Sequence, residues 1–139
     1  MAKVSIIMPS YNSEKYIEFA LTSVAQQKYT DFELIIYDGA STDKTLDVIR
    51  SYENKINIRL ISEKDGGVND ACRKGFAAAN GDFICHLCST DGYFDPNFLF
   101  EATSFLENNI EYDAIFSSGA QEISDTGKPL YKWRPWVQP

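Results

Sequence analysis

The chain alternates between short apolar runs and amphipathic helical segments, and this alternation limits its fold more than any other feature. The apolar runs Val4–Met8, Phe32–Tyr37, Ile56–Ile61 and Phe83–Cys88 are short for helices but typical of strands. The last of these runs is expected to be a buried strand that ends in the polar cluster leading to Asp91. A segment with apolar residues at helical spacing follows each run. This order predicts an α/β fold with a mostly parallel, Rossmann-like sheet and helices on both faces.

The starts of the expected helices are predicted from capping residues. Ser13 is the expected N-cap of the first helix, and Ser41 or Thr42 that of the second. The third helix is expected over Val68–Ala79, where small residues would let it approach the sheet closely. Asp95-Pro96 is typical of the start of a fourth helix.

The last part of the chain is expected to add strands. Asp113–Ser118 predicts a fifth strand, and Gln121–Tyr131 predicts a hairpin or an extended arm around Thr126-Gly127. The tail from Trp133 to Pro139 has two interpretations, a chain that stops before its fold is complete or a strap packed on the surface. The 139 residues are expected to form one domain, 1–139.

Composition excludes several classes of partner. Lys and Arg number 13 against 20 Asp and Glu, which gives a net charge of −7 and disfavours nucleic acid as a partner. No apolar stretch is long enough for a transmembrane segment, and no signal peptide is expected. Three cysteines without framework spacing favour the cytoplasm. Peripheral attachment at the inner face of a membrane and a homo-oligomer both stay open.

Polar residues follow several of the predicted strands. Ser10-Tyr11-Asn12, Asp38 and Ser89-Thr90-Asp91 come directly after apolar runs, and Asp65 lies in a Gly-rich loop. Since ligands of open parallel sheets bind outside the carboxyl ends of the strands, these groups predict a binding crevice. The alternative is that the same residue types merely begin turns and helices.

These side chains suit a nucleotide that carries a diphosphate. The ring of Tyr11 would face the base, and Asp38 would accept hydrogen bonds from the base or the ribose. Asp91 would hold a divalent cation against the phosphates, and a hard oxygen ligand favours Mg²⁺ or Mn²⁺.

The spacing of Cys85 and Cys88 suggests a zinc or redox site, but the strand prediction disfavours it. Positions three apart on a strand point to opposite faces of the sheet, so the two thiols would not share a metal ion. His86 lies between them and shares the face of Cys88. Packing in the core is the expected role of all three residues.

Several ordered motifs make the sequence resemble the family 2 glycosyltransferases, which bind nucleotide sugars with a GT-A fold. The resemblance covers essentially the whole chain. It rests on the segments 4–12, 32–43, 62–67, 74–75, 80–84 and 89–91, which read VSIIMPSYN, FELIIYDGASTD, SEKDGG, KG, NGDFI and STD.

The resemblance implies a role for each candidate site residue. Pro9, Ser10 and Tyr11 would flank the nucleobase, Asp38 would bind the uracil or ribose, and Asp65 would line the base pocket. A second set would serve the phosphates, with Asp91 as the metal ligand of the family's DXD-type motif and Thr90 as a hydrogen-bond donor to phosphate or to a metal-bound water.

The resemblance also implies the reaction. A nucleoside-diphosphate sugar, expected to be a UDP-sugar, would transfer its sugar to an acceptor hydroxyl of a glycan or lipid-linked molecule, as in the synthesis of cell-envelope polysaccharide. The enzyme would invert the anomeric carbon and use Mn²⁺ or Mg²⁺, with a carboxylate as base.

The chain departs from the family pattern in two respects. The family usually has Asn or Asp where Cys88 stands and Asp where Thr90 stands, so the acidic motif is reduced to Asp91. The family's base and acceptor site lie well downstream, so the chain is expected to lack its C-terminal, acceptor-side part. We therefore assign no catalytic base and expect weak or no turnover, with an inactive nucleotide-binding or assembly module as the alternative.

Overall fold

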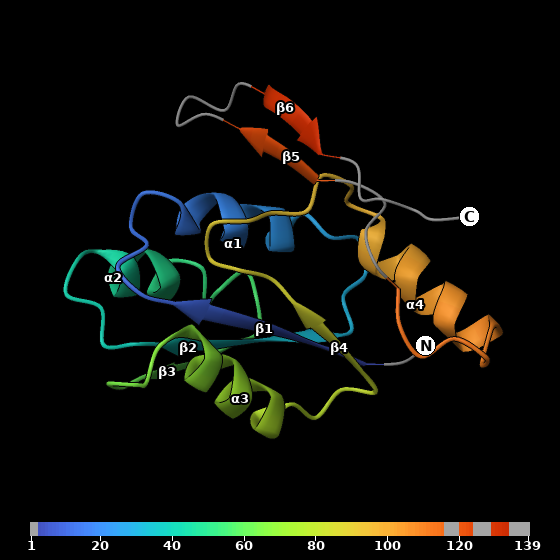
Figure 1. Ribbon diagram of the computed structural model, residues 1–139, viewed down its shortest axis with the longest axis horizontal. Coiled ribbons are helices and arrows are strands. Elements are labelled where there is room, and N and C mark those ends of the chain that lie inside the picture. The colour runs from blue at the N-terminus through green and yellow to red at the C-terminus, as the bar shows by residue number, and fades with distance from the viewer. Residues whose placement is uncertain (1–2, 116–119, 124–128, 134–139) are drawn as a thin grey trace.

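Four parallel strands form the central sheet of the structure, a computed structural model that describes residues 3–115, 120–123 and 129–133 (Figure 1). The strands are β1 (Val4–Ser10), β2 (Phe32–Asp38), β3 (Ile58–Ser62) and β4 (Phe83–His86), and their order across the sheet is β3-β2-β1-β4. The predicted parallel α/β sheet is confirmed.

Helices cover both faces of this sheet, as expected (Figure 1). Helices α1 (Ile17–Ala25) and α2 (Thr45–Arg50) lie on one face, and α3 (Val68–Ala78) lies on the other. Helix α4 (Phe98–Asn108) follows β4. Because side chains alternate along a strand, the two faces of β1 divide the core between these two layers.

Helix α1 packs on one set of β1 side chains, and α3 packs on the other set. Ile6 and Met8 are fully buried in a cluster with residues of α1 and α2. Ile7 points the opposite way, and a Cβ built on Gly75 would lie 2.3 Å from its Cγ2 atom. Glycine at position 75 therefore allows the close approach of α3 that the small residues predicted.

The edge position of β4 corrects the expectation of a buried strand. Among the strands of this sheet β4 pairs only with β1, and it ends at His86 rather than Cys88. Ile84 is 52% exposed. His86 is exposed too, with its Nε2 atom 3.4 Å from Cys72 Sγ, so its assignment to the core was wrong. Cys85 is half-buried and lies 3.0 Å from the hydroxyl of Tyr93.

The helix starts also differ from the expected caps. Tyr16 and Lys44 are the N-caps of α1 and α2, without side-chain hydrogen bonds, because Ser13 and Ser41 are engaged elsewhere. Helix α4 begins at Phe98 with Asn97 as its N-cap, two residues after the start predicted from Asp95-Pro96.

The predicted hairpin is confirmed by an antiparallel pair, β5 (Ala120–Ile123) and β6 (Pro129–Trp133). Its expected turn at Thr126-Gly127 and the tail after Trp133 lie outside the described residues. The second half of the predicted strand Asp113–Ser118 lies there too, and its first three residues, 113–115, do not form a strand. Within the described ranges, none of the helices is long and apolar enough to cross a membrane.

Candidate functional site

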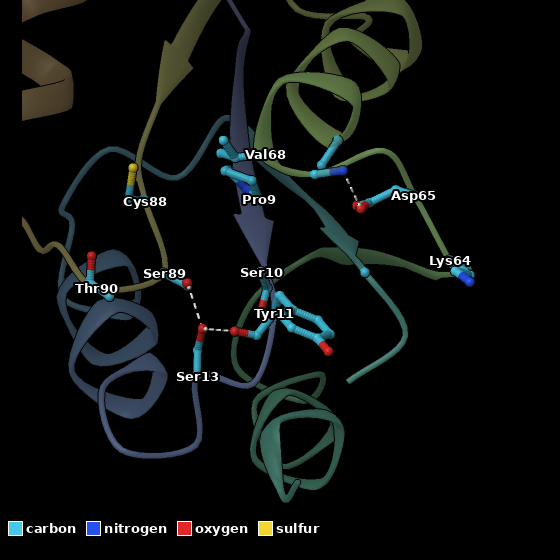
Figure 2. Close-up of a pocket in the computed structure, with 13 residues that line it drawn as sticks. Pro9, Ser10, Tyr11, Ser13, Lys64, Asp65, Val68, Cys88, Ser89 and Thr90 are labelled. Atoms are coloured by element: carbon cyan, nitrogen blue, oxygen red, sulfur yellow. Dashed lines mark hydrogen bonds between the residues drawn. The ribbon is translucent and has the colours of Figure 1, made fainter. Parts of the chain in front are cut away.

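A cavity of about 570 Å³ opens at the carboxyl ends of the parallel strands, where the crevice was predicted (Figure 2). Its lining comes from the ends of β1 and β2, from the loop between β3 and α3, and from the segment after β4. Five of the seven predicted site residues line it, namely Pro9, Ser10, Tyr11, Asp65 and Thr90. The topology thus brings together segments that are far apart in the sequence.

Ser10 and Tyr11 form the end of β1 at the cavity (Figure 2). Ser10 is 6% exposed, and its hydroxyl has no hydrogen-bond partner within the described part of the chain. A buried hydroxyl without a partner is costly, so a ligand atom that bonds to it would be bound favourably. Tyr11, in contrast, is 63% exposed and offers a ring face at the rim.

Asp38 is predicted to bind the nucleotide, but the structure does not place it in the lining of the cavity. It is 1% exposed. One carboxylate oxygen accepts hydrogen bonds from the backbone N–H of Ser41 and the hydroxyl of Ser62, both at 2.8 Å. The other accepts from the hydroxyl of Ser41. Asp38 therefore organises the loop after β2 through donors of the chain itself.

Asp65 lies between the Tyr11 rim and the start of α3 (Figure 2). Its Oδ1 atom accepts a hydrogen bond of 2.8 Å from the backbone N–H of Gly67, whose φ of +99° favours glycine. A Cβ on Gly39 would lie 3.3 Å from both carboxylate oxygens of Asp65 and from the Tyr11 ring. The glycine at position 39 thus leaves room for both side chains.

Thr90 lines the cavity, whereas the predicted metal ligand Asp91 is exposed and lies just outside the lining. The Thr90 hydroxyl donates to Asp91 Oδ1 over 3.4 Å, and the Asp91 backbone N–H donates to the carbonyl of Cys88 at 3.0 Å. Within the described residues, no group of three or more His, Cys, Asp or Glu side chains is arranged to hold a metal ion.

This donor set fits one kind of divalent ion site. Mg²⁺ is often bound by one or two carboxylates, with phosphates of the substrate and water as its other ligands. Asp91 supplies such a carboxylate, and Thr90 beside it supplies a hydroxyl for phosphate or water. Asp91 and Thr90 are therefore the residues that would hold Mn²⁺ or Mg²⁺ if the ion arrived together with a phosphate-bearing ligand.

Eight further residues line the cavity, and three polar ones among them, Ser13, Lys64 and Cys88, were not predicted there. Ser89 was expected at the crevice but was given no role. The hydroxyls of Ser13 and Ser89 lie 2.9 Å apart (Figure 2). Lys64 brings a positive charge to the rim of an otherwise acidic protein. The position of Lys64 next to Asp65 is the sequence signal that could have indicated it.

Cys88 is a neutral thiol in this setting. Burial raises its pKa, and the nearby carboxylate of Asp91 adds to this effect because a second negative charge is disfavoured. Cys72, whose pKa is raised by burial, lies across from it on α3. High thiol pKa values argue against a nucleophilic role for either cysteine.

The family is decided by a match along nearly the whole chain. The family model described as Glycosyl transferase family 2 matches residues 5–137. The chain belongs to this family. The expected resemblance is thereby confirmed.

Curated relatives of this family 2 chain are named as glycosyltransferases. The poly(ribitol-phosphate) beta-N-acetylglucosaminyltransferase TarS of Staphylococcus aureus is 35% identical over 113 residues, which are 78% of this chain and 20% of TarS. A PGL/p-HBAD biosynthesis glycosyltransferase of Mycobacterium tuberculosis is 32% identical over 114 residues, 81% of this chain and 44% of the relative. The chain thus spans less than half the length of these relatives.

Solved structures confirm the fold of the family 2 chain. A crystal structure of residues 1–349 of S. aureus TarS in complex with UDP-GlcNAc has a TM-score of 0.74 and 28% identity, covering 87% of this chain and 40% of that one. The mannosyltransferase PcManGT from Pyrobaculum calidifontis, in complex with GDP-Man and Mn²⁺, has a TM-score of 0.68 and 24% identity, covering 76% and 32%. The second likeness bears on the fold only.

Proposed function

We propose that the chain carries the donor-binding part of a glycosyltransferase that uses a nucleoside-diphosphate sugar, most simply a UDP-sugar. The observation that carries this proposal is the cavity at the ends of the parallel strands, lined by Pro9, Ser10, Tyr11, Asp65 and Thr90. The buried Ser10 hydroxyl without a partner supports a ligand there. The complex of TarS with UDP-GlcNAc supports the choice of uridine.

The proposed roles follow the position of each side chain. The base lies against the Tyr11 ring and near Asp65, and the phosphates lie towards Thr90 and Asp91. Lys64 supplies a positive charge that a chain with a net charge of −7 needs in order to attract a diphosphate. Asp38 acts by holding the loop after β2.

The reaction we propose is transfer of the sugar to an acceptor hydroxyl with inversion at the anomeric carbon. Mn²⁺ or Mg²⁺, bound at Asp91 together with the diphosphate, would stabilise the leaving group's charge. The acceptor is a glycan or a lipid-linked molecule, and the pathway is the synthesis of cell-envelope polysaccharide. We propose a cytoplasmic location. Cell fractionation tests this location. A cytoplasmic protein would be found in the supernatant, whereas a peripherally attached one would be found with the membranes and released from them by salt.

Calorimetric titration tests the donor site directly. UDP, dTDP, GDP and ADP are titrated with and without Mn²⁺ into the chain, into Asp91→Ala and into the control Asp47→Ala, which removes an exposed carboxylate from α2. We expect UDP to bind most tightly, Mn²⁺ to raise its affinity, and Asp91→Ala alone to abolish that rise. A chain that is folded by circular dichroism yet binds none of the four nucleotides would contradict the proposal.

A second candidate function is a nucleotide-binding or assembly module that no longer catalyses. Thr90 favours it, because the family usually has a carboxylate at this position and Asp91 then remains without an acidic neighbour in the motif. Measuring transfer from UDP-sugars by a longer form that includes the acceptor side, with Thr90 and with Thr90→Asp, separates the two candidates. Robust transfer with Thr90 would eliminate the inactive module.

A further inference from the structure

The short loop that carries Thr90 and Asp91 is held down by helix α1 on its far side. The backbone N–H of Tyr93 donates a hydrogen bond of 3.0 Å to the hydroxyl of Ser23 in α1. Gly92 packs directly against the ring of Phe19 in α1, since a Cβ added at position 92 would lie only 2.5 Å from that ring. Both side chains therefore fix the loop directly after Asp91.

Ser13 fixes the same loop on its near side. Its hydroxyl lies 2.9 Å from that of Ser89, and both serines are 6% exposed. Ser13 also donates to the carbonyl of Tyr11 at 3.2 Å, so its single proton is committed and Ser89 is the donor of the shared bond. Figure 2 shows this chain of two hydrogen bonds from Ser89 through Ser13 to Tyr11.

Ser13 is itself anchored, so the chain of bonds is not a loose contact. Its backbone N–H donates at 2.7 Å to the hydroxyl of Thr45, which is fully buried at the start of α2. The serine thus joins α2, the loop after β1 and the loop after β4. The loop after β1 carries the Tyr11 side of the cavity, and the loop after β4 carries the Thr90 side.

We infer that Ser13 is a positioning residue that holds the Tyr11 side and the Thr90–Asp91 side of the donor site at one fixed spacing, so that a nucleoside diphosphate and a divalent cation strengthen each other's binding. This inference rests on the proposed function. A ligand that reaches from base to metal must contact both loops at once. Because the free protein already holds the two loops in place, ligand binding loses less conformational entropy.

The test measures how much Mn²⁺ raises the affinity for UDP. Calorimetry gives the ratio of the UDP dissociation constants without and with Mn²⁺ for the unsubstituted chain, Ser13→Ala, Ser89→Ala and the double variant. We expect the ratio to fall about fivefold in each single variant, the usual net effect of one hydrogen bond. The double variant should lose no more than Ser13→Ala, because Ser89→Ala removes only the bond that Ser13→Ala already removes. Affinity for UDP without Mn²⁺ should change less than twofold.

Controls separate positioning from general destabilisation. Ser13→Thr keeps a hydroxyl and should keep most of the Mn²⁺ effect, and Ser51→Ala removes an exposed serine hydroxyl at the end of α2 and should change nothing. Thermal unfolding verifies that each variant is folded. If Ser13→Ala does not fold, Ser89→Ala removes the same bond from the other side and decides the question.

Three results would overturn the inference. The ratio is unchanged in Ser13→Ala and Ser89→Ala, or UDP affinity falls equally with and without Mn²⁺, which is what a merely structural serine would give. The third result is that the unsubstituted chain binds UDP with the same affinity with and without Mn²⁺. This result would reject the inference but not the proposed donor site. A chain that binds no UDP at all would instead reject the proposed function itself.

Discussion

Replacing Asp38 tests whether this carboxylate serves the fold before it serves a ligand. Its two oxygens accept three hydrogen bonds from Ser41 and Ser62, and the residue is 1% exposed. Ser41 in turn accepts a bond of 2.8 Å from the backbone N–H of Asn12, the residue after Tyr11. Loss of the carboxylate therefore loosens the loop after β2 first and the Tyr11 rim second.

The magnitude follows from the three bonds of Asp38. Hydrogen bonds to a charged group contribute about 1.5–3 kcal/mol each and neutral ones about 0.5–1.5 kcal/mol. Asp38→Asn makes the remaining bonds neutral and replaces one acceptor by an NH₂ group, while it removes the cost of burying a charge. We expect the free energy of unfolding to fall by about 2 kcal/mol for Asp38→Asn and by about 4 kcal/mol for Asp38→Ala.

Urea unfolding followed by circular dichroism measures these changes, and calorimetry gives UDP affinity for the same samples. Asp47→Asn is the matched control, since its side chain is 79% exposed and only 3.7 Å from Arg50, a surface pair worth less than about 0.5 kcal/mol. Asp38→Asn with unchanged stability and abolished UDP binding would refute our reasoning. Asp38 would then be a direct ligand of the nucleotide whose contacts with Ser41 and Ser62 are dispensable.

Three further predictions concern charge, pH and packing. Lys64→Met should weaken UDP more than uridine, by about fivefold at low salt and less at high salt, as calorimetry would show; equal losses would contradict a phosphate role. Burial of Glu33 raises its pKa, but hydrogen bonds from Ser5 and from a backbone N–H outweigh this effect and lower the pKa below its usual 4.5. Its stabilisation is therefore present above pH 4.5 and is lost progressively as the pH falls through the lowered pKa. Glu33→Gln should cost about 1–2 kcal/mol at pH 7 and progressively less as the pH falls below 4.5, and a pH-independent cost in urea unfolding would disprove this. Gly75→Ala should destabilise by about 1–2 kcal/mol through contact with Ile7, and an additional Ile7→Ala should cost less in Gly75→Ala than alone; strict additivity would exclude that contact.

The strands and helices of the sheet were predictable because each carries a local signal. Apolar runs of the right length, the turn residues between them and the helical spacing of Ile17, Ala20, Leu21 and Val24 need no knowledge of the rest of the chain. The order of strands in the sheet has no such signal. Phe83–Cys88 was therefore interpreted as buried, although β4 lies at the edge of the described part of the sheet and Ile84 is half exposed.

The candidate site was predictable in its location but not in its contacts. Strand ends in a parallel sheet meet at one edge, so Ser10, Tyr11 and Thr90 were correctly expected near one another. The partners of each polar side chain are set by tertiary structure. Ser13 was expected to cap α1, yet its hydroxyl bonds Ser89, a residue 76 positions away, and no local pattern encodes such a pair.

The edge position of β4 makes the local stability of the site separable from that of the sheet. Among the strands that the structure describes, β4 has one hydrogen-bonded neighbour whereas β1 and β2 each have two, and edge elements with few neighbours tend to open first in native proteins. The backbone N–H of Leu87, which donates to the carbonyl of Ile7 at 3.0 Å, reports on this opening through hydrogen exchange. A ligand that binds only the closed form would slow exchange at Leu87 by about 100-fold at a concentration 100 times its Kd. Amides at the centre of β1 would exchange slowly even without ligand, so the nucleotide would add protection from hydrogen exchange mainly at β4.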